Sequence, residues 1–361
     1  YTTGLTNLPY SSAGGALVTA KTGGYLDGSF YVQRPAGGSP DLGRQVNYSA
    51  VNDGTSWAGL DFITKEGAAD YLQSILIDAE ILYLFGTETV EAWQNNPTTG
   101  RPVRIPGAMA KYGSISRWGP LAMNGKVYLV GGDAQGGPVA YRIDNSTPTR
   151  ISTHAEEEQW NAAGLGVNCI SYSYMEEGHI FWVINFGAQA WAWDETSKKW
   201  SKRMCWSGSA FTPYLTYYHT YIPEWGSGKH ITAGNLLNGN VYESSVNFYD
   251  DGGSDLGWRV AIPYRYNGGN YIYFGLMTLE METGTVPSGA APTITRDYSD
   301  DRGKNFIQPT TASIGVHDDT SLRVQWFPAG ASRGRVWRLA GAGQYKVALI
   351  DLECDEGLGA T

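Results

Sequence analysis

Acidic side chains are the residues of this sequence with the clearest capacity for chemistry. Hydrolysis of a glycosidic bond needs two carboxylates that face each other across a pocket. Candidates for that role are Asp61, Glu66, Asp133, Glu176 and Glu224. Their spacing gives no way to pair them, and the arginines that would bind an acidic sugar are scattered along the chain. The sequence therefore predicts no catalytic residues.

The histidines, cysteines and glycines do not form a metal or phosphate motif. The histidines show no HxH, HExxH or HxxxH spacing; they are His154, His179, His219, His230 and His317. The three widely spaced cysteines (Cys169, Cys205 and Cys354) fit no disulfide framework, and we expect buried thiols. The glycine-rich run at 131–137 lacks the Lys-Ser/Thr ending of a phosphate loop. We expect no metal and no cofactor.

Two other patterns have both a functional and a structural interpretation. The stretch YSDDRGKNF (298–306) loosely matches Ser-x-Asp-x-Gly-x-Thr-Trp and resembles the Asp-box turn of sialidase-type propellers. We interpret it as a structural turn, because a short acidic side chain there can accept hydrogen bonds from nearby backbone N–H groups. The aromatic run Tyr214, Tyr217, Tyr218, His219 and Tyr221 is either a sugar platform or packing between sheets, and packing is the favoured interpretation.

The elements that position these residues are short strands in a repeated unit. The clearest copy runs from Ile81 to Asn96, where an apolar strand is followed by a Gly-Thr turn and an alternating strand. In the second strand, Val90 and Ala92 share one face, and Glu91 and Trp93 share the other. Similar hairpins occur at 25–34, 126–144, 179–203 and 229–245. From 81 onward, their leading strands recur about every 50 residues, a period typical of the blades of a β-propeller.

Composition supports an all-β class and disfavours two kinds of partner. The chain has 361 residues, of which 47 are Gly and 17% are charged. This composition suits tight turns between packed sheets. A net charge of −9 disfavours electrostatic binding of nucleic acid over the whole surface. No apolar run approaches the length of a membrane span, so we expect no membrane insertion. Because the sequence opens at Tyr1 without Met or a signal-peptide pattern, we expect a fragment or a processed product.

The pattern changes near residue 255. The segment 247–258 is a cluster of turn residues, and longer strands follow at 271–282, 293–298, 321–326, 335–339 and 346–353. These strands alternate or run apolar, as in a β-sandwich. We therefore predict propeller blades over 1–254, with an N-terminal part that we expect to be truncated, and a sandwich-like region over 255–361. One helix is predicted to begin near Ser152 or Thr153, in RISTHAEEEQW, as an insertion between blades.

Nine stretches resemble, in order, the packaged-DNA stabilisation proteins of the tail hub of short-tailed bacteriophages. They are LDFITKEG (60–67), LFGTETVEAW (84–93), RIPGAMAKYG (104–113), RISTHAEE (150–157), SYSYMEEGHIFWVINF (171–186), AWDETSKKWSKR (192–203), LLNGNVYE (236–243), YSDDRGKNF (298–306) and KVALIDLE (346–353). Members of that family are longer at the N-terminus. The collinear order is more specific than any one motif.

The resemblance implies a structural protein of the virion tail, assembled in the host cytoplasm, rather than an enzyme. It implies a ring homo-oligomer, a hexamer in the virion, below the portal and its adaptor. The ring would help retain packaged DNA and would offer attachment surfaces to a tail needle and tailspikes. DNA would pass through its channel without sequence-specific binding. The family has no shared catalytic residues.

Two alternatives come from other functional classes. One is a propeller glycosidase or sialidase-like enzyme, and the other is a carbohydrate-binding propeller for host adhesion. Both predict a pocket at the propeller axis lined with carboxylates or aromatic side chains. A tail hub predicts a blocked or featureless axis and a broad interface between subunits.

Overall fold

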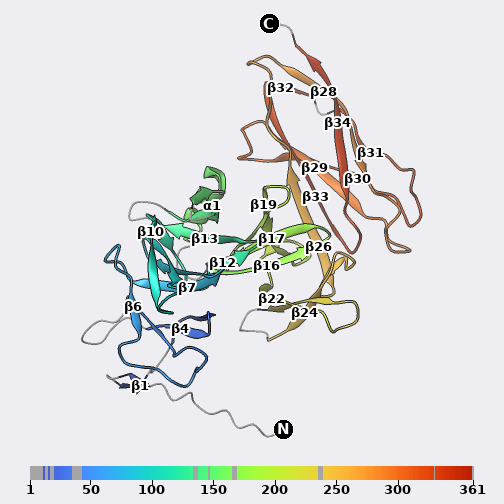
Figure 1. Cartoon of the computed structure of the whole chain (residues 1–361). Helices are drawn as coiled ribbons and strands as arrows, with labels where there is room; N and C mark the ends of the chain where they lie inside the picture. The colour runs from blue at the N-terminus through green and yellow to red at the C-terminus, as the bar shows by residue number, and fades with distance from the viewer. Residues whose placement is uncertain are drawn as a thin grey trace. The chain divides into compact units, whose positions relative to one another are not determined.

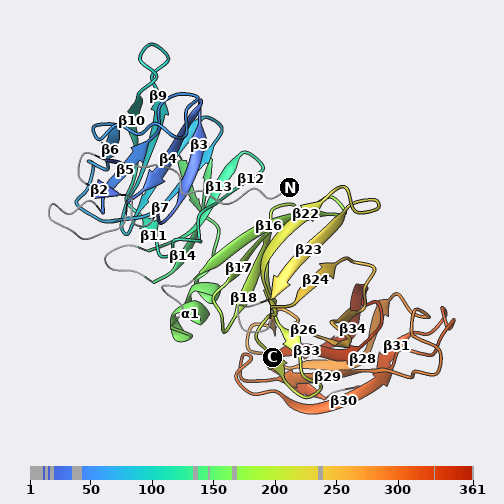
Figure 2. The same ribbon diagram turned by 90° about the horizontal axis from the view of Figure 1, so that it is seen from below.

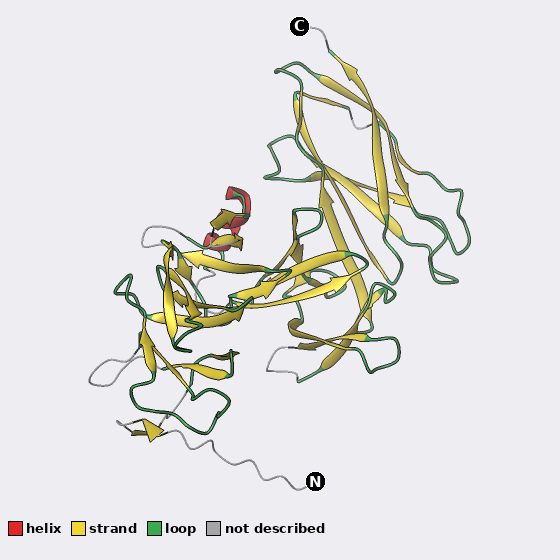
Figure 3. Cartoon of the chain, viewed as in Figure 1, coloured by secondary structure: helices red, strands yellow, loops and turns green. Residues whose placement is uncertain are grey.

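The computed structural model describes residues 11–12, 15–16, 20–34, 43–132, 137–144, 147–164, 169–234, 239–328 and 330–359 (Figure 1). Figure 3 shows that strands make up most of this part of the chain, with one helix. The chain divides into two compact units. The first comprises Tyr1–Arg203 and Tyr214–Val241, and the second comprises Met204–Pro213 and Tyr242–Thr361.

Five antiparallel sheets of three to five strands build the described part of the first unit, and strands that follow one another in sequence are mostly neighbours in a sheet. The first sheet holds β3 (Gly23–Leu26), β4 (Ser29–Gln33), β5 (Gln45–Tyr48) and β6 (Phe62–Thr64), and the second holds β7 (Leu72–Asp78), β8 (Ile81–Gly86), β9 (Val90–Asn95) and β10 (Pro102–Ala110). The third holds β11 (Gly113–Ser114), β12 (Leu121–Met123), β13 (Lys126–Gly132), β14 (Val139–Asp144) and β15 (Thr147–Arg150). The fourth holds β16 (Ile170–Glu176), β17 (His179–Asn185), β18 (Ala190–Asp194) and β19 (Lys199–Arg203). The fifth holds β22 (Thr216–Ile222), β23 (Lys229–Gly234) and β24 (Val241–Ser244), of which only Val241 in β24 belongs to the first unit. A further pair, β1 (Ser11–Ser12) and β2 (Gly15–Ala16), lies near the N-terminus. Each of the five predicted hairpins lies within one of the five sheets, so the repeat is confirmed.

Successive sheets pack face to face, as the blades of a β-propeller do. One apolar cluster joins the first and second sheets, and a second joins the second and third. A third cluster joins the third and fourth sheets, and a small one around Tyr172 lies on the face of the fourth sheet. Figure 2 shows the sheets following one another from blue to yellow. Since the second and third sheets are covered on both faces, their strands β8, β9 and β13 are almost wholly buried, whereas β10 and β15 are largely exposed.

The β8–β9 hairpin shows how sequence alternation serves two cores at once. Leu82, Leu84 and Trp93 pack into the cluster shared with the first sheet. The side chains on the opposite face of the hairpin, Val90 and Ala92 among them, pack into the cluster shared with the third sheet. The predicted faces of the second strand are therefore confirmed, because the period of two sends neighbouring residues to opposite sides.

The helix α1 (His154–Ala162) lies between β15 and β16 and begins as predicted. Thr153 is its N-cap, and the Glu156 carboxylate accepts a hydrogen bond from the Thr153 backbone N–H at 2.8 Å, which completes a capping box. Trp160 is fully buried and contacts the rings of Trp191 and Trp200. The helix is therefore held on the fourth sheet by one large aromatic side chain.

The second unit is built of two antiparallel sheets around a core of its own. One sheet holds β25 (Asp250–Asp251), β26 (Ser254–Ala261), β27 (Arg265–Tyr266), β29 (Thr293–Ser299), β30 (Ile307–Ser313) and β33 (Gly334–Gly343). The other holds β28 (Ile272–Met281), β31 (Val324–Trp326), β32 (Ala331–Ser332) and β34 (Leu349–Leu358). The short hairpin of β20 (Cys205–Trp206) and β21 (Phe211–Thr212) also belongs to this unit, where β20 contacts β26.

The predicted strands of this unit overlap β28, β29, β31, β33 and β34, but several elements differ from the prediction, the short strands β25, β27 and β32 among them. The turn-residue cluster predicted over 247–258 is wrong in its second half, because β26 begins at Ser254 and pairs with β33. The strand β30 and the hairpin β20–β21 are absent from the sequence interpretation. Both β26 and β30 are largely exposed, so they lack the apolar pattern that identifies a strand.

Candidate functional site

The five candidate carboxylates do not meet in a pocket. Asp61 precedes β6, Glu66 lies in the connection from β6 to β7, and Glu176 ends β16. Glu224 lies in the turn after β22, and Asp133 falls outside the described residues. None of the four described carboxylates lines either of the two cavities found in the described chain. The arrangement therefore gives no support to a hydrolytic pair.

The larger cavity lies where the inner strands of the first unit meet. The strands β3, β7, β12, β16 and β22 contact one another in this order along the blades. The cavity has a volume of about 560 Å³ and is lined by residues of β7, β16 and β22, by the start of β3 and the residues before it, and by the loop before β12. This is the position that both sugar-binding alternatives predict for a site.

The lining of this cavity is aromatic and cationic. It includes the side chains of Lys21, Arg117, Trp118 and Tyr218, with Ser171 beside them. Among the described residues that line it there is no Asp, Glu or His. Aromatic residues and two cations therefore line a cavity beside the inner strands, while the blocked or featureless axis of a tail hub stays a prediction. The aromatic run contributes Tyr218, but Lys21, Arg117 and Trp118 were missed; the one signal near them is the Gly119-Pro120 break.

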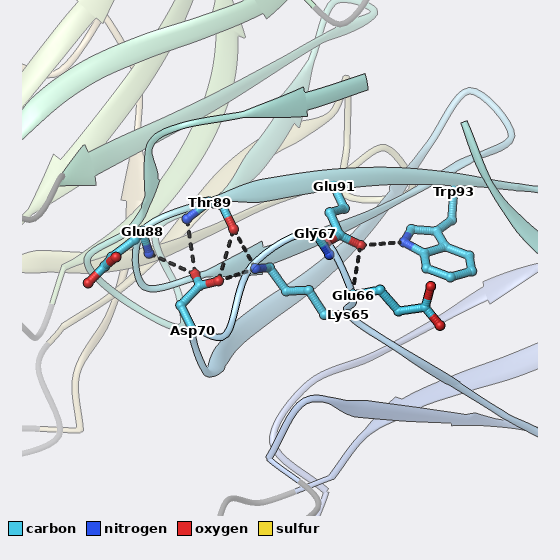
Figure 4. A network of polar contacts seen from close by, with 8 residues as sticks. All are labelled: Lys65, Glu66, Gly67, Asp70, Glu88, Thr89, Glu91 and Trp93. Carbon is cyan, nitrogen blue, oxygen red and sulfur yellow. Dashed lines mark hydrogen bonds and ion pairs between the residues drawn. The ribbon is translucent and has the colours of Figure 1, made fainter. Parts of the chain in front are cut away.

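Two of the family-like stretches meet in a buried ionic network in the second blade. The side chain of Lys65 is fully buried and binds both the Asp70 carboxylate and the Thr89 hydroxyl (Figure 4). Asp70 also accepts hydrogen bonds from the backbone N–H groups of Glu88 and Thr89, at 2.9 and 3.0 Å. Burial opposes ionisation of Asp70, but these partners outweigh it and lower its pKa. A Cβ on Gly86 would overlap the Asp70 carboxylate, so the turn requires glycine there.

Glu91 closes the other end of the same connection. Its carboxylate accepts hydrogen bonds from the backbone N–H groups of Glu66 and Gly67 and from the indole of Trp93, the last at 3.2 Å (Figure 4). Glu91 is fully buried. The stretches at 60–67 and 84–93 therefore fix the connection between two blades to the β8–β9 hairpin, which is a structural role.

A second network joins the third and fourth blades. The Glu195 carboxylate lies 3.2 Å from both Lys126 Nζ and Arg142 Nη1, and it also pairs with Lys198. The indole of Trp193 donates to it at 2.9 Å. Burial opposes ionisation of Glu195, but the hydrogen bonds from Lys198 and Trp193 outweigh it and lower the pKa to about 2. The stretch at 192–203 thus also stabilises packing between blades.

The Asp-box-like stretch forms the turn between β29 and β30, in the second unit. Asp301 accepts hydrogen bonds from the Ser299 hydroxyl at 2.6 Å and from the backbone N–H groups of Lys304 and Asn305, at 3.0 and 2.9 Å. Gly303 has φ +88°, as the turn requires. These hydrogen bonds lower the pKa of Asp301. The structural interpretation of this stretch is confirmed.

The aromatic run divides between two environments. His219 stacks on Tyr172 and Tyr174 of the fourth sheet, at centroid distances of 5.9 and 5.6 Å, so it packs between blades. Its Nε2 lies 2.9 Å from Nδ1 of His230. Tyr218 and Tyr221 are exposed. Packing is thus confirmed for His219, while Tyr218 is left open to the cavity.

Metal ligands do not gather in the part of the chain that the structure describes. No group of three or more His, Cys, Asp or Glu side chains there is arranged to hold a metal ion. Cys169 and Cys205 are buried thiols, as expected, while Cys354 is only half-buried. No helix among the described residues is long and apolar enough to cross a membrane.

Some solved structures resemble the chain weakly. A GH43 glycoside hydrolase with an engineered active site is 8% identical over 92% of this chain and 97% of that chain, with a TM-score of 0.30. A fructofuranosidase from Schwanniomyces occidentalis is 7% identical over 94% and 96%, with a TM-score of 0.30. A sialidase from Trypanosoma rangeli is 8% identical over 94% of each chain, with a TM-score of 0.26. Likeness at this level says nothing about activity. A search of curated proteins finds no match.

Family models give a specific result. The model described as the β-propeller of bacteriophage P22 Gp10 matches residues 17–245, and the model described as its β-sandwich matches residues 257–356. Together they cover both units and bear out the predicted fold class, an all-β propeller with a C-terminal sandwich. The resemblance seen in the nine stretches is confirmed, and the chain belongs to the bacteriophage P22 Gp10 family of phage stabilisation proteins.

Proposed function

We propose that this protein is a structural subunit of a phage tail hub that joins the portal and its adaptor to the distal tail and helps retain packaged DNA. Membership of the Gp10 family over both units is the observation that supports it most strongly. The buried networks around Lys65 and Glu195 add support, since family-like stretches serve to stiffen the blades. A rigid ring subunit requires such stiffness and no catalytic group.

The proposal includes a domain division and a set of partners. We assign residues 1–254 to the propeller and 255–361 to the sandwich. Six copies would form the ring in the virion tail, with tail needle and tailspikes attached below. The net charge of −9 is consistent with DNA that passes without adhering to the wall. We propose that the protein is not an enzyme, which its membership of a family of phage stabilisation proteins supports.

The test is the absolute mass of the protein by light scattering after size exclusion, alone and mixed with the portal–adaptor complex of the same phage. We expect a mass increase of several subunits on mixing. The portal without its adaptor is the matched control and should give no such increase. A protein that stays monomeric and unbound in the presence of the adaptor would contradict the proposal.

A further inference from the structure

The charge of the cavity at the inner strands differs in sign from that of the whole chain. The chain carries a net charge of −9, yet among the described residues that line the cavity the charged ones are Lys21 and Arg117. Within the described chain, neither side chain forms an ion pair. Two unpaired cations in a concave surface create a local field that attracts an anion.

Trp118 is held in place through its backbone, while its side chain remains available. Its carbonyl accepts a hydrogen bond from Ser171 N–H at 2.9 Å, and the Ser171 hydroxyl donates to the Gly119 carbonyl at 2.6 Å. These bonds fix the loop before β12 against β16. The Trp118 side chain is 55% exposed. An aromatic ring with a fixed backbone and an exposed face is preorganised to bind a flat apolar surface.

The cations and the rings are close enough to serve one ligand. The guanidinium carbon of Arg117 lies 6.0 Å from the centre of the Trp118 ring. Tyr218, which is 44% exposed, lines the same cavity from β22. The anionic group of a ligand could bind Arg117, while an apolar ring face of the same ligand packs against an aromatic side chain.

The dimensions of the cavity favour a small ligand over nucleic acid. A volume of about 560 Å³ lies in the range of small-molecule sites. Single-stranded nucleic acid generally occupies a groove of about 4 to 16 nucleotides with successive stacking rings, and this cavity offers two. The hydroxyl group of Ser171 adds a polar partner of the kind that sugars use.

We propose that this cavity binds a short acidic saccharide, with Arg117 and Lys21 on its carboxylate or other anionic group and Trp118 or Tyr218 against a sugar ring. Since the described residues that line the cavity include no Asp or Glu, the saccharide would be bound without being cleaved. This property is separate from assembly into a tail hub.

Titration calorimetry with the full chain tests the proposal, with trigalacturonic acid as the probe. Its fully methyl-esterified form keeps the rings and removes the charge, and a deoxythymidine trinucleotide tests the nucleic-acid alternative. We expect a Kd of about 1 mM or below for trigalacturonic acid, at least about tenfold weaker binding of the ester, and weaker binding in added salt.

Four variants separate the site from the rest of the surface. Trp118→Ala and Arg117→Gln should each weaken binding about tenfold, and Arg117→Gln should also reduce the salt dependence. Trp225→Ala and Lys111→Gln are the matched controls, because Trp225 is likewise 55% exposed and Lys111 is an exposed cation outside the cavity. Both controls should bind as the unaltered protein does.

Four results would overturn the assignment. The first is no binding of trigalacturonic acid, and the second is equal binding of the acid and its ester. The third is binding of the trinucleotide alone, which would assign the cavity to nucleotides. Retained binding in both Trp118→Ala and Arg117→Gln would place the saccharide elsewhere and would likewise reject this site.

Discussion

At the scale of single residues, the buried charged groups of this chain stabilise its fold. Lys65, Glu91 and Glu195 are each buried among partners that lie far away in sequence. A buried charge is costly unless it is paired, so each network is sensitive to the loss of one member. The same property makes them poor candidates for catalysis, since their hydrogen-bonding capacity is already used within the fold.

Replacing Lys65 tests the network of the second blade. Lys65→Met should lower the free energy of unfolding by about 3 to 5 kcal/mol, because Asp70 would remain buried without its cation. The double variant Lys65→Met/Asp70→Asn should recover part of this loss, since it removes the unpaired charge. Urea denaturation measures both.

The exposed residue Lys111 supplies the control for this experiment. Lys111→Met should change the free energy of unfolding by less than about 0.5 kcal/mol. If Lys65→Met were as mild as the control, the buried pair would contribute little to stability and our account of Figure 4 would be wrong.

His219 makes stability depend on pH in a defined window. Burial and the neighbouring His230 lower the pKa of His219 to about 4, against about 6.5 in an unfolded chain. Between these values the unfolded chain binds a proton that the folded chain does not, so stability falls as pH falls. From pH 7.5 to 5 the loss should be about 1 kcal/mol, allowing for screening at this half-buried site.

Urea denaturation across this pH range provides the measurement. His219→Gln should flatten the dependence, whereas His154→Gln, at the exposed start of α1, should leave it unchanged. An unchanged slope in His219→Gln would show that other groups cause the dependence.

At the scale of elements, two of the blade sheets each contain a tryptophan whose indole donates a hydrogen bond to a carboxylate two residues away. Trp93 in β9 donates to Glu91, and Trp193 in β18 donates to Glu195. Both rings are buried, with exposures of 7% and 5%. The strand period of two places each ring and its carboxylate on one face, so the indole both fills the core and satisfies a buried anion.

Truncation of these rings should be severe. Trp93→Ala and Trp193→Ala should each lower the free energy of unfolding by about 3 to 5 kcal/mol, because each leaves a cavity and an orphaned acceptor. Trp225→Ala, in an exposed turn, should cost less than about 0.5 kcal/mol. Equal losses for buried and exposed tryptophans in urea denaturation would refute this account of blade packing.

At the scale of the whole molecule, the two units have separate cores. The core around Trp337 draws only on residues of the second unit, while the four clusters of the blades draw only on the first. Units with their own cores generally unfold as separate cooperative transitions.

Calorimetry of the full chain should therefore show two transitions. Trp337→Ala should lower the melting temperature of only one, and Trp93→Ala should lower that of only the other, since each ring belongs to one core. A single transition, shifted equally by both substitutions, would show that the units unfold together.

The sequence by itself determined the local structural motifs of the protein and indicated the family to which it belongs. The hairpins at 81–96 and 179–203, the cap at Thr153 and the turn at 298–306 depend on residues a few positions apart, whose periodicity and turn chemistry are readable along the chain. The ordered stretches were enough to indicate the Gp10-like family. The exposed strand β26 was missed because pairing with the distant strand β33, not local pattern, makes it a strand. The strand β30 pairs with its neighbour β29 but was missed because its exposed residues lack an apolar alternation.

Only the tertiary structure decided which distant residues meet. Nothing in the local pattern indicated that Lys65 would lie between Asp70 and Thr89, or that Lys21, Arg117 and Tyr218 would line one cavity. These contacts between distant residues follow from sheet register and from the packing of one blade on the next. Because such packing is set by many weak contacts across the whole unit, no short stretch of sequence contains it.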